Sequence, residues 1–500
     1  MTKNKIERWL DKIGLAVAFV LLSLPVAAQS PKAPANWQNL DLRKDSVFGI
    51  GMEKANAELL KGKIPVPVTV AVIDGGVDTG HEDLKSVLWV NIGEKPGNKK
   101  DDDKNGYVDD VNGWNFLGSS RGSFIHDNLE MVRLLRAAIV KDPNSAETKK
   151  WKGQIEARLK PLDRALGEME IQRNALKDIT LTIGKQYPRA EDFRNYRYRT
   201  AAEAQVLVMM VRGLKDNPSF MQEFEDRYQR YRVQRDFMYN MDYDPRAGNK
   251  EFQHPFYGNG DVKGLEPSHG THIAGIIAAD RNNGTGMNGI ADKARIMSIT
   301  AVPDGDALDR DMAAAIRYAV DNGARVINIS SGKEGESPQK QLVDDAVKYA
   351  MEKDVLIVTA AGNRGEDLKV ESGYPSRNYL DGGKAASWIN VGASGPRDDG
   401  TLLPWFSNYG AKAVDVFAPG VDIWSTWPGN AYRYESGTSM AAPVVSGLAA
   451  LIWSYYPKLS ALQVKEIIMK SVVKRDVLKD KCISGGVVNA YAALQLAASY

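Results

Sequence analysis

The stretch that decides the fold is Val68-Thr69-Val70-Ala71-Val72-Ile73-Asp74-Gly75-Gly76. Its first six residues are almost wholly apolar and rich in valine, which is typical of a short strand buried on both faces. The aspartate and two glycines that follow place a carboxylate where the strand ends. Aspartate at such a position is also a common turn former, so Asp74 alone does not indicate a functional site.

Runs of the same kind recur along the chain, and helical patterns separate them. The runs occupy 294–299, 326–329, 355–359, 389–392 and 414–417, and the helical patterns include 309–322, 338–353 and 460–473. Strands that alternate with helices predict an α/β fold with a doubly wound, mostly parallel sheet. Ligands of such sheets bind beyond the carboxyl ends of the strands, so we expect the functional site on that side.

Residues 123–253 break this alternation. Charged, glutamine and aromatic residues take over there, and apolar side chains keep a helical spacing over 155–183 and 220–231. Gly184 is a predicted helix stop and Pro161 a predicted kink. A helical hairpin or small bundle explains this pattern better than a cofactor site. The predicted segments are a signal peptide at 1–28, the first part of the main domain at 29–122, a helical insertion at 123–253, and the second part of the main domain at 254–500.

The first residues indicate export. Basic residues precede an apolar run over 13–24, and the small-residue site Val26-Ala27-Ala28 follows, which is the pattern of a secretory signal peptide. The run is shorter than the roughly 20 residues that span a bilayer, so we favour cleavage after Ala28 over an uncleaved anchor. We expect a periplasmic or extracellular protein with no stable membrane span after cleavage.

Charge and cysteine content narrow the choice of partners. The chain has 65 Lys+Arg and 63 Asp+Glu, and removal of residues 1–28 subtracts four basic and two acidic residues, which leaves 61 of each sign. A formally neutral chain has no long-range field that favours nucleic acid. Cys482 is the only cysteine, so no intramolecular disulfide can form. The sequence leaves the oligomeric state open.

A candidate nucleophile lies in Gly437-Thr438-Ser439-Met440-Ala441-Ala442-Pro443. Ser439 stands between a glycine turn and an apolar helix, where helix N–H groups favour a developing oxyanion. A serine hydroxyl needs a base, and Ser268-His269-Gly270-Thr271-His272 supplies a candidate in His269. His269 and His272 also suggest a metal pair, but no acidic third ligand lies at helical distance, so we expect His272 to be a structural neighbour that points away.

Four motifs together resemble the subtilisin-like serine peptidase family, in that family's order Asp, His, Ser. They are Val70-Ala71-Val72-Ile73-Asp74, His269-Gly270-Thr271-His272, Ala360-Ala361-Gly362-Asn363 and the Ser439 motif. The resemblance covers about 47–118 and 258–500 and implies a secreted serine endopeptidase. It makes Ser439 the nucleophile, His269 the general base and then acid, and Asp74 the group that orients the imidazole. Asn363 would donate to the oxyanion, with a loop-capping asparagine as the alternative, and no cofactor is required for this chemistry.

The same resemblance implies contacts with protein or peptide substrates. One segment resembles the edge that pairs with an extended peptide, and two others resemble a wall and the base of the first specificity pocket. These are Ser330, Ser331 and Gly332 for the edge, Ala360, Ala361 and Gly362 for the wall, and Gly373 for the base. A glycine at the base leaves the pocket deep, so we expect a large apolar side chain immediately before the cut.

An acidic segment predicts a structural calcium site. Residues 101–110 read Asp-Asp-Asp-Lys-Asn-Gly-Tyr-Val-Asp-Asp, with oxygen ligands at alternate positions and glycine at the sixth, as in the start of a calcium loop. The candidate ligands are Asp101, Asp103, Asn105 and Asp109, and Asp83 resembles a calcium ligand of the family. Asn112 stands where a closing glutamate is expected, and the alternative is a solvated acidic turn.

Two features depart from the family pattern. Gly75 stands where the family usually has Ser or Thr, so we expect the backbone N–H groups of Gly75 and Gly76 to steady the Asp74 carboxylate instead. Residues 29–66 leave no room for the family's usual prodomain, so the core either folds unaided or is helped by another element, for which 123–253 is a candidate. We also expect this insertion to shield or gate the cleft. A catalytically silent scaffold is the rival interpretation, although all four motif residues are present.

Overall fold

A nine-stranded sheet built around the 68–76 stretch organises the part of the chain that the computed structural model describes, residues 33–370 and 373–500. The strand order is β14-β15-β11-β10-β8-β6-β1-β5-β2, and every neighbouring pair is parallel except β14 and β15. The strands are β1 (Val68–Asp74), β2 (Gly113–Asn115), β5 (Ala294–Thr300), β6 (Val326–Ile329), β8 (Leu356–Ala360), β10 (Trp388–Ser394), β11 (Val416–Pro419), β14 (Val473–Lys474) and β15 (Gly486–Val487). The predicted signal peptide at 1–28 lies outside the described residues.

The predicted strands and the predicted fold class are confirmed. All six predicted strands lie in this sheet, with ends that differ from the prediction by two residues at most. β1 lies between β5 and β6, in a register that pairs Ile73 with Ile299 and Asp74 with Thr300. β2, β14 and β15 have only two or three residues each, too few to produce an apolar run in the sequence.

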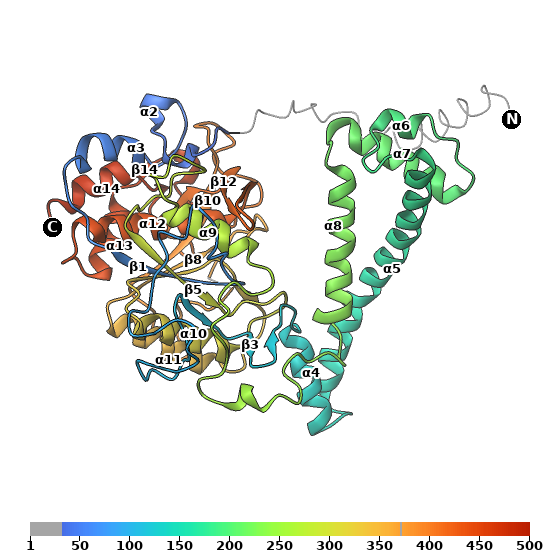
Figure 1. Ribbon diagram of the computed structural model, residues 1–500, viewed down its shortest axis with the longest axis horizontal. Helices are drawn as coiled ribbons and strands as arrows, with labels where there is room; N and C mark the ends of the chain where they lie inside the picture. The colour runs from blue at the N-terminus through green and yellow to red at the C-terminus, as the bar shows by residue number, and fades with distance from the viewer. Residues whose placement is uncertain (1–32, 371–372) are drawn as a thin grey trace. The chain divides into compact units, whose positions relative to one another are not determined.

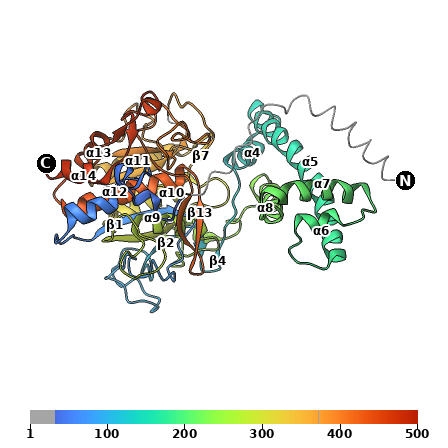
Figure 2. The ribbon, with the colours of Figure 1, turned by 90° about the horizontal axis from the view of Figure 1, so that it is seen from above.

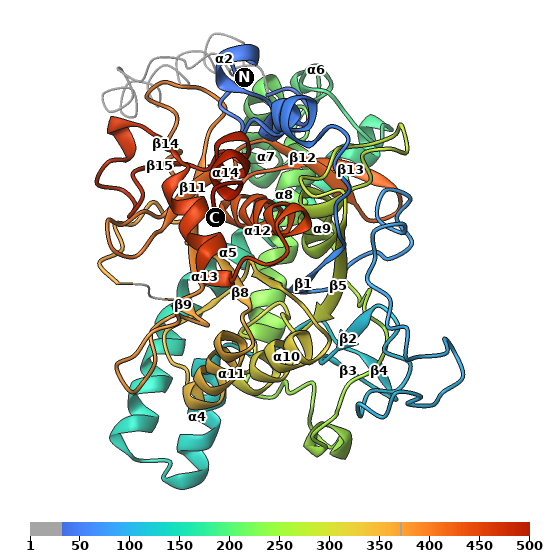
Figure 3. The same cartoon turned by 90° about the vertical axis from the view of Figure 1, so that its left-hand side faces the viewer.

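Helices cover both faces of the sheet (Figure 1). α9 (Ser268–Ala278) and α12 (Thr438–Tyr455) pack together and against β1 and β5, and α12 also crosses β6, β8, β10 and β11. α10 (Asp309–Asp321) and α11 (Lys340–Glu352) lie side by side on the other face (Figure 3), in a core with Ile73, Ile299 and Ile327. α12 is the one described helix long and apolar enough to cross a membrane, and 89% of it is buried inside the protein.

Residues 123–253 form helices, as the sequence predicts. They include α4 (Glu130–Lys141), α5 (Ala146–Ile183), α6 (Ala190–Arg194), α7 (Ala201–Asp216), α8 (Phe220–Val233), a π-helical turn at Gln234–Met238 and a 3₁₀ turn at Lys250–Gln253. α5 to α8 lie together (Figure 2), and they share an apolar core of their own, with Leu176, Ile179, Met210 and Phe224 among its members. α5 is continuous through Pro161 and ends at Gly184, which takes a left-handed conformation. The periodic apolar residues therefore pack on one another, as expected of a small bundle.

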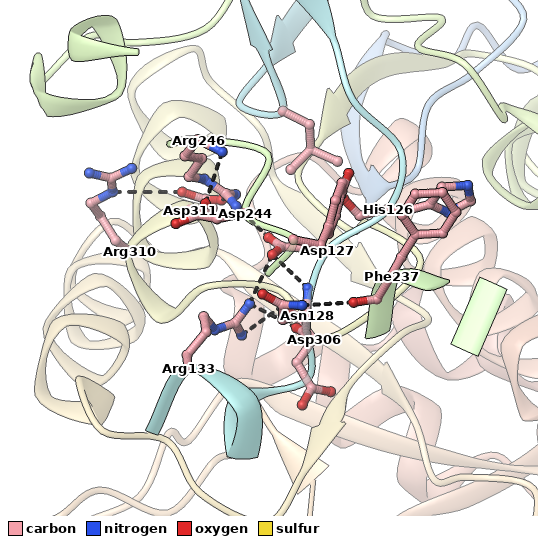
Figure 4. Close-up of polar contacts among 12 residues, drawn as sticks. His126, Asp127, Asn128, Arg133, Phe237, Asp244, Arg246, Asp306, Arg310 and Asp311 are labelled. Carbon is pink, nitrogen blue, oxygen red and sulfur yellow. Dashed lines mark hydrogen bonds and ion pairs between the residues drawn. The ribbon is translucent and has the colours of Figure 1, made fainter. Parts of the chain in front are cut away.

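Buried ion pairs join the base of this insertion to α10 (Figure 4). The Asp127 carboxylate pairs with Arg133 at 3.3 Å and with Arg246, and Arg246 also pairs with Asp311 of α10. Asp127 and Asp311 are almost fully buried. Backbone pairing adds to this connection, because the Asp127 N–H donates to the Asp304 carbonyl at 2.9 Å. The insertion is thus fastened beside the segment that follows β5.

The remaining elements flank this framework. α13 (Ala461–Lys470) and α14 (Ala490–Ala497) pack beside α12. The short helices at the amino end are Trp37–Asn39, α2 (Leu42–Asp45), α3 (Met52–Ala55) and Asn56–Leu60, and the last two of these pack on α14. A further 3₁₀ turn is Asp476–Leu478. Three two-stranded sheets are β3 (Gly118–Ser119) with β4 (Gly122–Ser123), β7 (Lys333–Glu334) with β9 (Gly373–Tyr374), and β12 (Ile423–Trp427) with β13 (Ala431–Glu435).

Candidate active site

The site begins at the carboxyl end of β1, where the buried side chain of Asp74 leaves the sheet. The Gly75 N–H donates to Asp74 Oδ1 at 2.8 Å, so a backbone group does steady this carboxylate as expected. Two neighbouring glycines allow α9 to approach closely. A Cβ on Gly76 would lie 2.2 Å from the Lys263 carbonyl oxygen, and one on Gly270 would lie 2.2 Å from the Gly76 carbonyl oxygen.

His269, in the first turn of α9, meets Asp74. Its Nδ1 lies 2.8 Å from Oδ2 and 3.0 Å from Oδ1 of Asp74, so Nδ1 donates and Nε2 is left as the potential base. Desolvation lowers the pKa of His269, but the charge and hydrogen bond of Asp74 outweigh it, and the pKa lies above its ordinary value of 6.5. This is the arrangement that orients an imidazole and stabilises its cation.

Ser439 is the second residue of α12 and is half-buried. Its hydroxyl donates to the Ser330 carbonyl at 3.0 Å, and the Ser330 hydroxyl donates back to the Ser439 carbonyl at 3.1 Å. Within residues 33–370 and 373–500, no hydrogen bond joins Ser439 to His269. Catalytic hydrogen bonds are often absent or long in a ligand-free site, and rotation about the serine Cα–Cβ bond redirects the hydroxyl.

Asn363 follows β8 and faces Ser439. Its Oδ1 accepts from the N–H and the hydroxyl of Thr438, at 2.8 and 2.9 Å. These contacts engage Oδ1, whereas Nδ2 has no acceptor in the described part of the chain, and Asn363 lines the same pocket as Ser439. Nδ2 is therefore a free donor beside the nucleophile, the geometry that an oxyanion site needs.

The predicted substrate residues line one pocket of about 240 Å³ together with Ser439 and Asn363. They are Ser330, Ser331, Gly332, Ala360, Ala361, Gly362 and Gly373. Sequence reasoning missed Thr359, Leu368, Tyr374, Asn390 and Asn408, which lie in the same wall but in no recognised motif. Among residues 33–370 and 373–500, no charged side chain contributes to this lining.

A second pocket, of about 340 Å³, adjoins the first at Ser331 and contains Asp74 and His269. Its walls include Leu117, Phe124 and Val302. Ser439 therefore lines one pocket and the pair of Asp74 and His269 lines the other, and the two pockets meet at the predicted peptide-binding edge.

His272 points away from His269, as expected. It is fully buried, and its Nε2 lies 3.1 Å from the carbonyl oxygens of Ile423 and Arg433. Burial lowers its pKa to about 4, so the ring is neutral at physiological pH and Nε2–H donates to these carbonyls. A buried ring engaged with strands β12 and β13 is not placed to share a metal ion with His269.

The acidic loop brings only part of the predicted calcium set together. Carboxylate oxygens of Asp101 and Asp103 lie within 4.8 Å of each other and of a Glu94 oxygen. Glu94 was missed because it precedes the loop by seven residues, outside the spacing that signals one. Asp109 instead accepts the N–H groups of Gly97 and Lys99 at 2.9 and 2.8 Å.

The two other candidate ligands are occupied by hydrogen bonds. The Asn105 amide donates to Asp103 and Asp110, both at 3.1 Å, while its Oδ1 accepts from the Tyr107 N–H. Asp83 is fully buried, and it accepts from the Met287 N–H at 3.1 Å and from the Tyr432 hydroxyl at 3.2 Å. The oxygen cluster that fits a hard cation is therefore Glu94, Asp101 and Asp103.

A buried aspartate paired with a partly exposed histidine, a serine at a helix amino terminus and an amide donor, all at the carboxyl side of a parallel sheet, form the arrangement expected of a serine hydrolase. The model of the subtilase family matches residues 67–489, and the chain belongs to that family. Relatives that the chain matches are named a serine proteinase and a subtilisin.

Curated relatives agree with this assignment. The chain is 46% identical over 188 residues to a thermophilic serine proteinase of Bacillus sp. (strain AK1), which covers 37% of this chain and 43% of that protein. It is 38% identical over 231 residues to subtilisin DY of Bacillus licheniformis, an alignment that covers 45% of this chain and 77% of that protein. It is 36% identical over 240 residues to a cell wall-associated protease of Bacillus subtilis (strain 168), an alignment that covers 48% of this chain and 24% of that protein. Each alignment thus spans less than half of this chain.

Proposed function

We propose that the protein hydrolyses peptide bonds with Ser439 as nucleophile, His269 as general base and acid, and Asp74 as the orienting carboxylate. The observation that carries the proposal is the 2.8 Å contact between His269 Nδ1 and the buried Asp74, beside a serine at a helix amino terminus. Asp74 fixes the proton on Nδ1, so that Nε2 is free to accept one.

The reaction begins when the Ser439 hydroxyl turns from the Ser330 carbonyl toward His269. His269 Nε2 takes the hydroxyl proton as Oγ bonds to the peptide carbonyl carbon, and the carbonyl oxygen becomes an oxyanion. Asn363 Nδ2 and backbone N–H groups at the start of α12 stabilise that oxyanion. His269 then gives its proton to the leaving amine as the C–N bond breaks, which leaves an acyl-serine that water hydrolyses by the same steps.

Substrate binding follows from the same pocket. An extended peptide pairs with 330–332, and the side chain before the cut enters the hollow of about 240 Å³. The described residues that line the hollow are uncharged, so they offer a lysine, arginine or glutamate no ionic partner to offset its lost hydration. We expect large apolar side chains at this position, and a cleavage profile from a peptide library dominated by charged residues would contradict that.

A fluorophosphonate probe tests the nucleophile directly. We expect the purified wild type to react with the probe at Ser439 and the Ser439→Ala variant to stay unlabelled, while peptide mapping locates the adduct. Correctly folded wild type that does not react would favour the alternative of a silent scaffold that keeps the fold for protein recognition.

We also propose a structural calcium ion at Glu94, Asp101 and Asp103. An all-oxygen donor set with three carboxylates is what this cation prefers. Bound calcium would neutralise mutual repulsion in the loop and take no part in the chemistry of Ser439. Isothermal titration should show binding that Asp101→Asn weakens, and chelator should lower the melting temperature. No heat of binding together with unchanged melting in chelator would remove the ion from the proposal.

Export and domain organisation complete the proposal. We propose a signal peptide at 1–28, a main domain at 29–122 and 254–500, and the insertion at 123–253, in a periplasmic or extracellular enzyme. The basic and apolar pattern of the first residues supports export, and one relative is named a cell wall-associated protease. Amino-terminal sequencing of the protein from fractionated cells should start at Gln29, and a cytoplasmic, uncleaved product would contradict this.

A further inference from the structure

A pocket of about 910 Å³ lies in the insertion where α5 and α7 end and α8 begins, and α6 forms one side of it. Figures 1 and 2 show these four helices together. The apolar part of the lining comes from Leu176, Pro188, Leu214 and Met221, which are buried or half-buried. Among the described residues that line the pocket, none belongs to the candidate active site or to the calcium cluster. The pocket is therefore a separate feature of the molecule.

The pocket is remote from the residues that fasten the insertion. At the base, the Phe237 ring stacks on His126 with 4.2 Å between the ring centroids, next to the ion pairs of Asp127 (Figure 4). The helical run from Phe220, beside the pocket, to Phe237 advances about 1.5 Å per residue, or roughly 25 Å in all. A partner bound at the pocket would therefore leave the base of the insertion undisturbed.

Three exposed cations contribute to the lining. They are Arg189, Arg194 and Lys215, from the two ends of α6 and the last turn of α7. In the part of the chain that the structure describes, no carboxylate forms an ion pair with any of the three. Guanidinium groups bind phosphate or carboxylate oxygens with two parallel hydrogen bonds, and lysine binds them as a point charge. These three side chains are thus available to an anionic partner.

The carboxylates of the lining oppose these cations only in part. Glu225 is one of them, and a hydrogen bond from Arg173 of α5 at 2.8 Å lowers its pKa, so its charge is already compensated. Glu191 is the other, and it is exposed. In the described lining, three cations without an ion-pair partner therefore outnumber a single such carboxylate. The excess positive charge favours an anion.

The chain around the pocket adds basic and exposed apolar side chains. Residues 185–199 contain five basic and two acidic side chains, although the whole chain has a formal net charge of only +2. Salt screens exposed charges beyond about 8 Å, so this local excess decides the attraction at the surface. Residues 181–198 also expose three large side chains, Leu181 by 70%, Tyr187 by 77% and Tyr198 by 55%. Basic side chains beside exposed tyrosine and leucine are typical of surfaces that bind the headgroup region of a membrane.

We propose that this end of the insertion docks on an anionic lipid surface, where the pocket receives the phosphate and the first acyl methylenes of one phospholipid. Arg189, Arg194 and Lys215 donate to the phosphate oxygens. The acyl chain covers Leu214 and Met221. An acidic polypeptide would satisfy the cations but leave this apolar part in contact with water, so an anionic amphiphile is the better fit. The docking is a function beyond peptide hydrolysis, and it holds the protein at a membrane surface.

Vesicle sedimentation tests the docking with the purified protein. We expect binding to vesicles of equal parts phosphatidylglycerol and phosphatidylcholine at a lipid concentration at least about tenfold lower than with phosphatidylcholine alone, because each cation beside an anionic surface adds about a fivefold factor in affinity. Higher salt should weaken this binding. Failure to sediment with the anionic vesicles, or equal binding to both kinds, would overturn the proposal. Binding to soluble polyglutamate but not to the vesicles would assign the surface to an acidic protein instead.

Arg194→Glu combined with Lys215→Glu reverses two charges of the lining and should raise the lipid concentration for half-maximal binding by more than about tenfold. Lys160→Glu combined with Arg164→Glu, at exposed positions earlier in α5, is the matched control and should raise it by less than about twofold. Thermal melting should show that both double variants are folded. Equal losses of binding in the two would mean that overall charge and not the pocket determines the docking, which would overturn the proposal.

A photoreactive lipid locates the site without any change in the pocket. Phosphatidylglycerol with a diazirine at the start of one acyl chain is mixed into the anionic vesicles, and adducts on the wild-type protein are mapped by peptide mass. We expect adducts within 176–194 and 214–225, and adducts confined to other segments would refute the pocket as the lipid site. Because neither measurement involves turnover, failure of the proposed peptidase function would appear as absent fluorophosphonate labelling with the docking intact.

Discussion

At the residue scale, the site is held by contacts that orient one atom of each functional side chain. Thr438 fixes the Asn363 amide through two hydrogen bonds, and Asp74 fixes the proton of His269. In both side chains, the nitrogen proposed to act on the substrate, Asn363 Nδ2 or His269 Nε2, is the one without a hydrogen-bond partner in the described residues. Removal of a single contact should therefore change catalysis with little change in stability.

Asn363→Ala should lower kcat by about 100- to 1000-fold and leave KM nearly unchanged. The donor acts on charge that develops only in the transition state, and a factor of this size is known for loss of the corresponding donor in a subtilisin. Steady-state kinetics on a short peptide provides the measurement. Thermal melting should match the wild type, since Asn363 is exposed, and a raised KM with constant kcat would contradict the assigned role.

The raised pKa of His269 should determine how kcat/KM falls as the pH is lowered. The base must be neutral, so kcat/KM should rise with pH through a midpoint above 6.5, the ordinary imidazole value. Asp74→Asn removes the charge that raises the pKa, and should move the midpoint down while lowering kcat/KM by about 10⁴-fold. A pH–rate profile of both proteins checks this, and an unmoved midpoint would show that another group titrates.

The sequence named the candidate reacting residues, but it did not predict the residues that position them. Asp74, His269, Ser439 and Asn363 stand in motifs whose order is informative. Thr438 orients Asn363 by donating to an Oδ1 that lies 75 positions away in the chain, and Glu94 joins Asp101 from outside the loop pattern. Such contacts come from tertiary packing, which local spacing does not encode.

At the element scale, strands were easier to predict than connections. The continuous apolar runs of β1, β5 and β6 are buried on both faces of the sheet, which is the condition that produces them. The segment 125–128 has no such pattern, yet it pairs with the backbone of Asp304 and carries the buried Asp127. A short connection fastened by ion pairs leaves no periodic signature in the sequence.

Arg246→Ala should destabilise the protein by about 3–5 kcal/mol, because it removes from two buried carboxylates, Asp127 and Asp311, the cation that they share. Arg235→Ala is the matched control: its pair with Asp163 is about half exposed, and its loss should cost less than about 1 kcal/mol.

Denaturant unfolding measures both variants, and hydrogen exchange should place the loosening of Arg246→Ala at 125–141. If both variants lost the same free energy of unfolding, the buried ion pairs of Arg246 would contribute no more to stability than the exposed pair of Arg235.

At the scale of the whole molecule, α9 links the catalytic centre to global stability through His272. The ring is fully buried and neutral, and its folded pKa of about 4 lies below the unfolded value near 6.5. Between these values the unfolded chain binds the proton and the folded chain does not. The stability that this group contributes is therefore present above pH 6.5 and is lost as pH falls toward 4.

This linkage should lower the free energy of unfolding by about 3 kcal/mol between pH 7 and pH 4. Denaturant unfolding across that range measures it, and His272→Gln should flatten the dependence by a similar amount. His254→Gln, at an exposed histidine, should leave the dependence as it is in the wild type. An identical slope in His272→Gln would assign the acid sensitivity to other groups.

The hydrogen bond from Ser439 to the Ser330 carbonyl has a consequence for the resting enzyme. In that rotamer the hydroxyl of the candidate nucleophile donates its proton to a backbone oxygen and not to His269. Each turnover thus starts with a side-chain rotation that breaks a bond worth about 0.5–1.5 kcal/mol. A peptide whose own N–H takes over the Ser330 carbonyl offsets that cost, whereas a small ester without an N–H does not. The resting rotamer of Ser439 therefore favours polypeptide substrates over small esters.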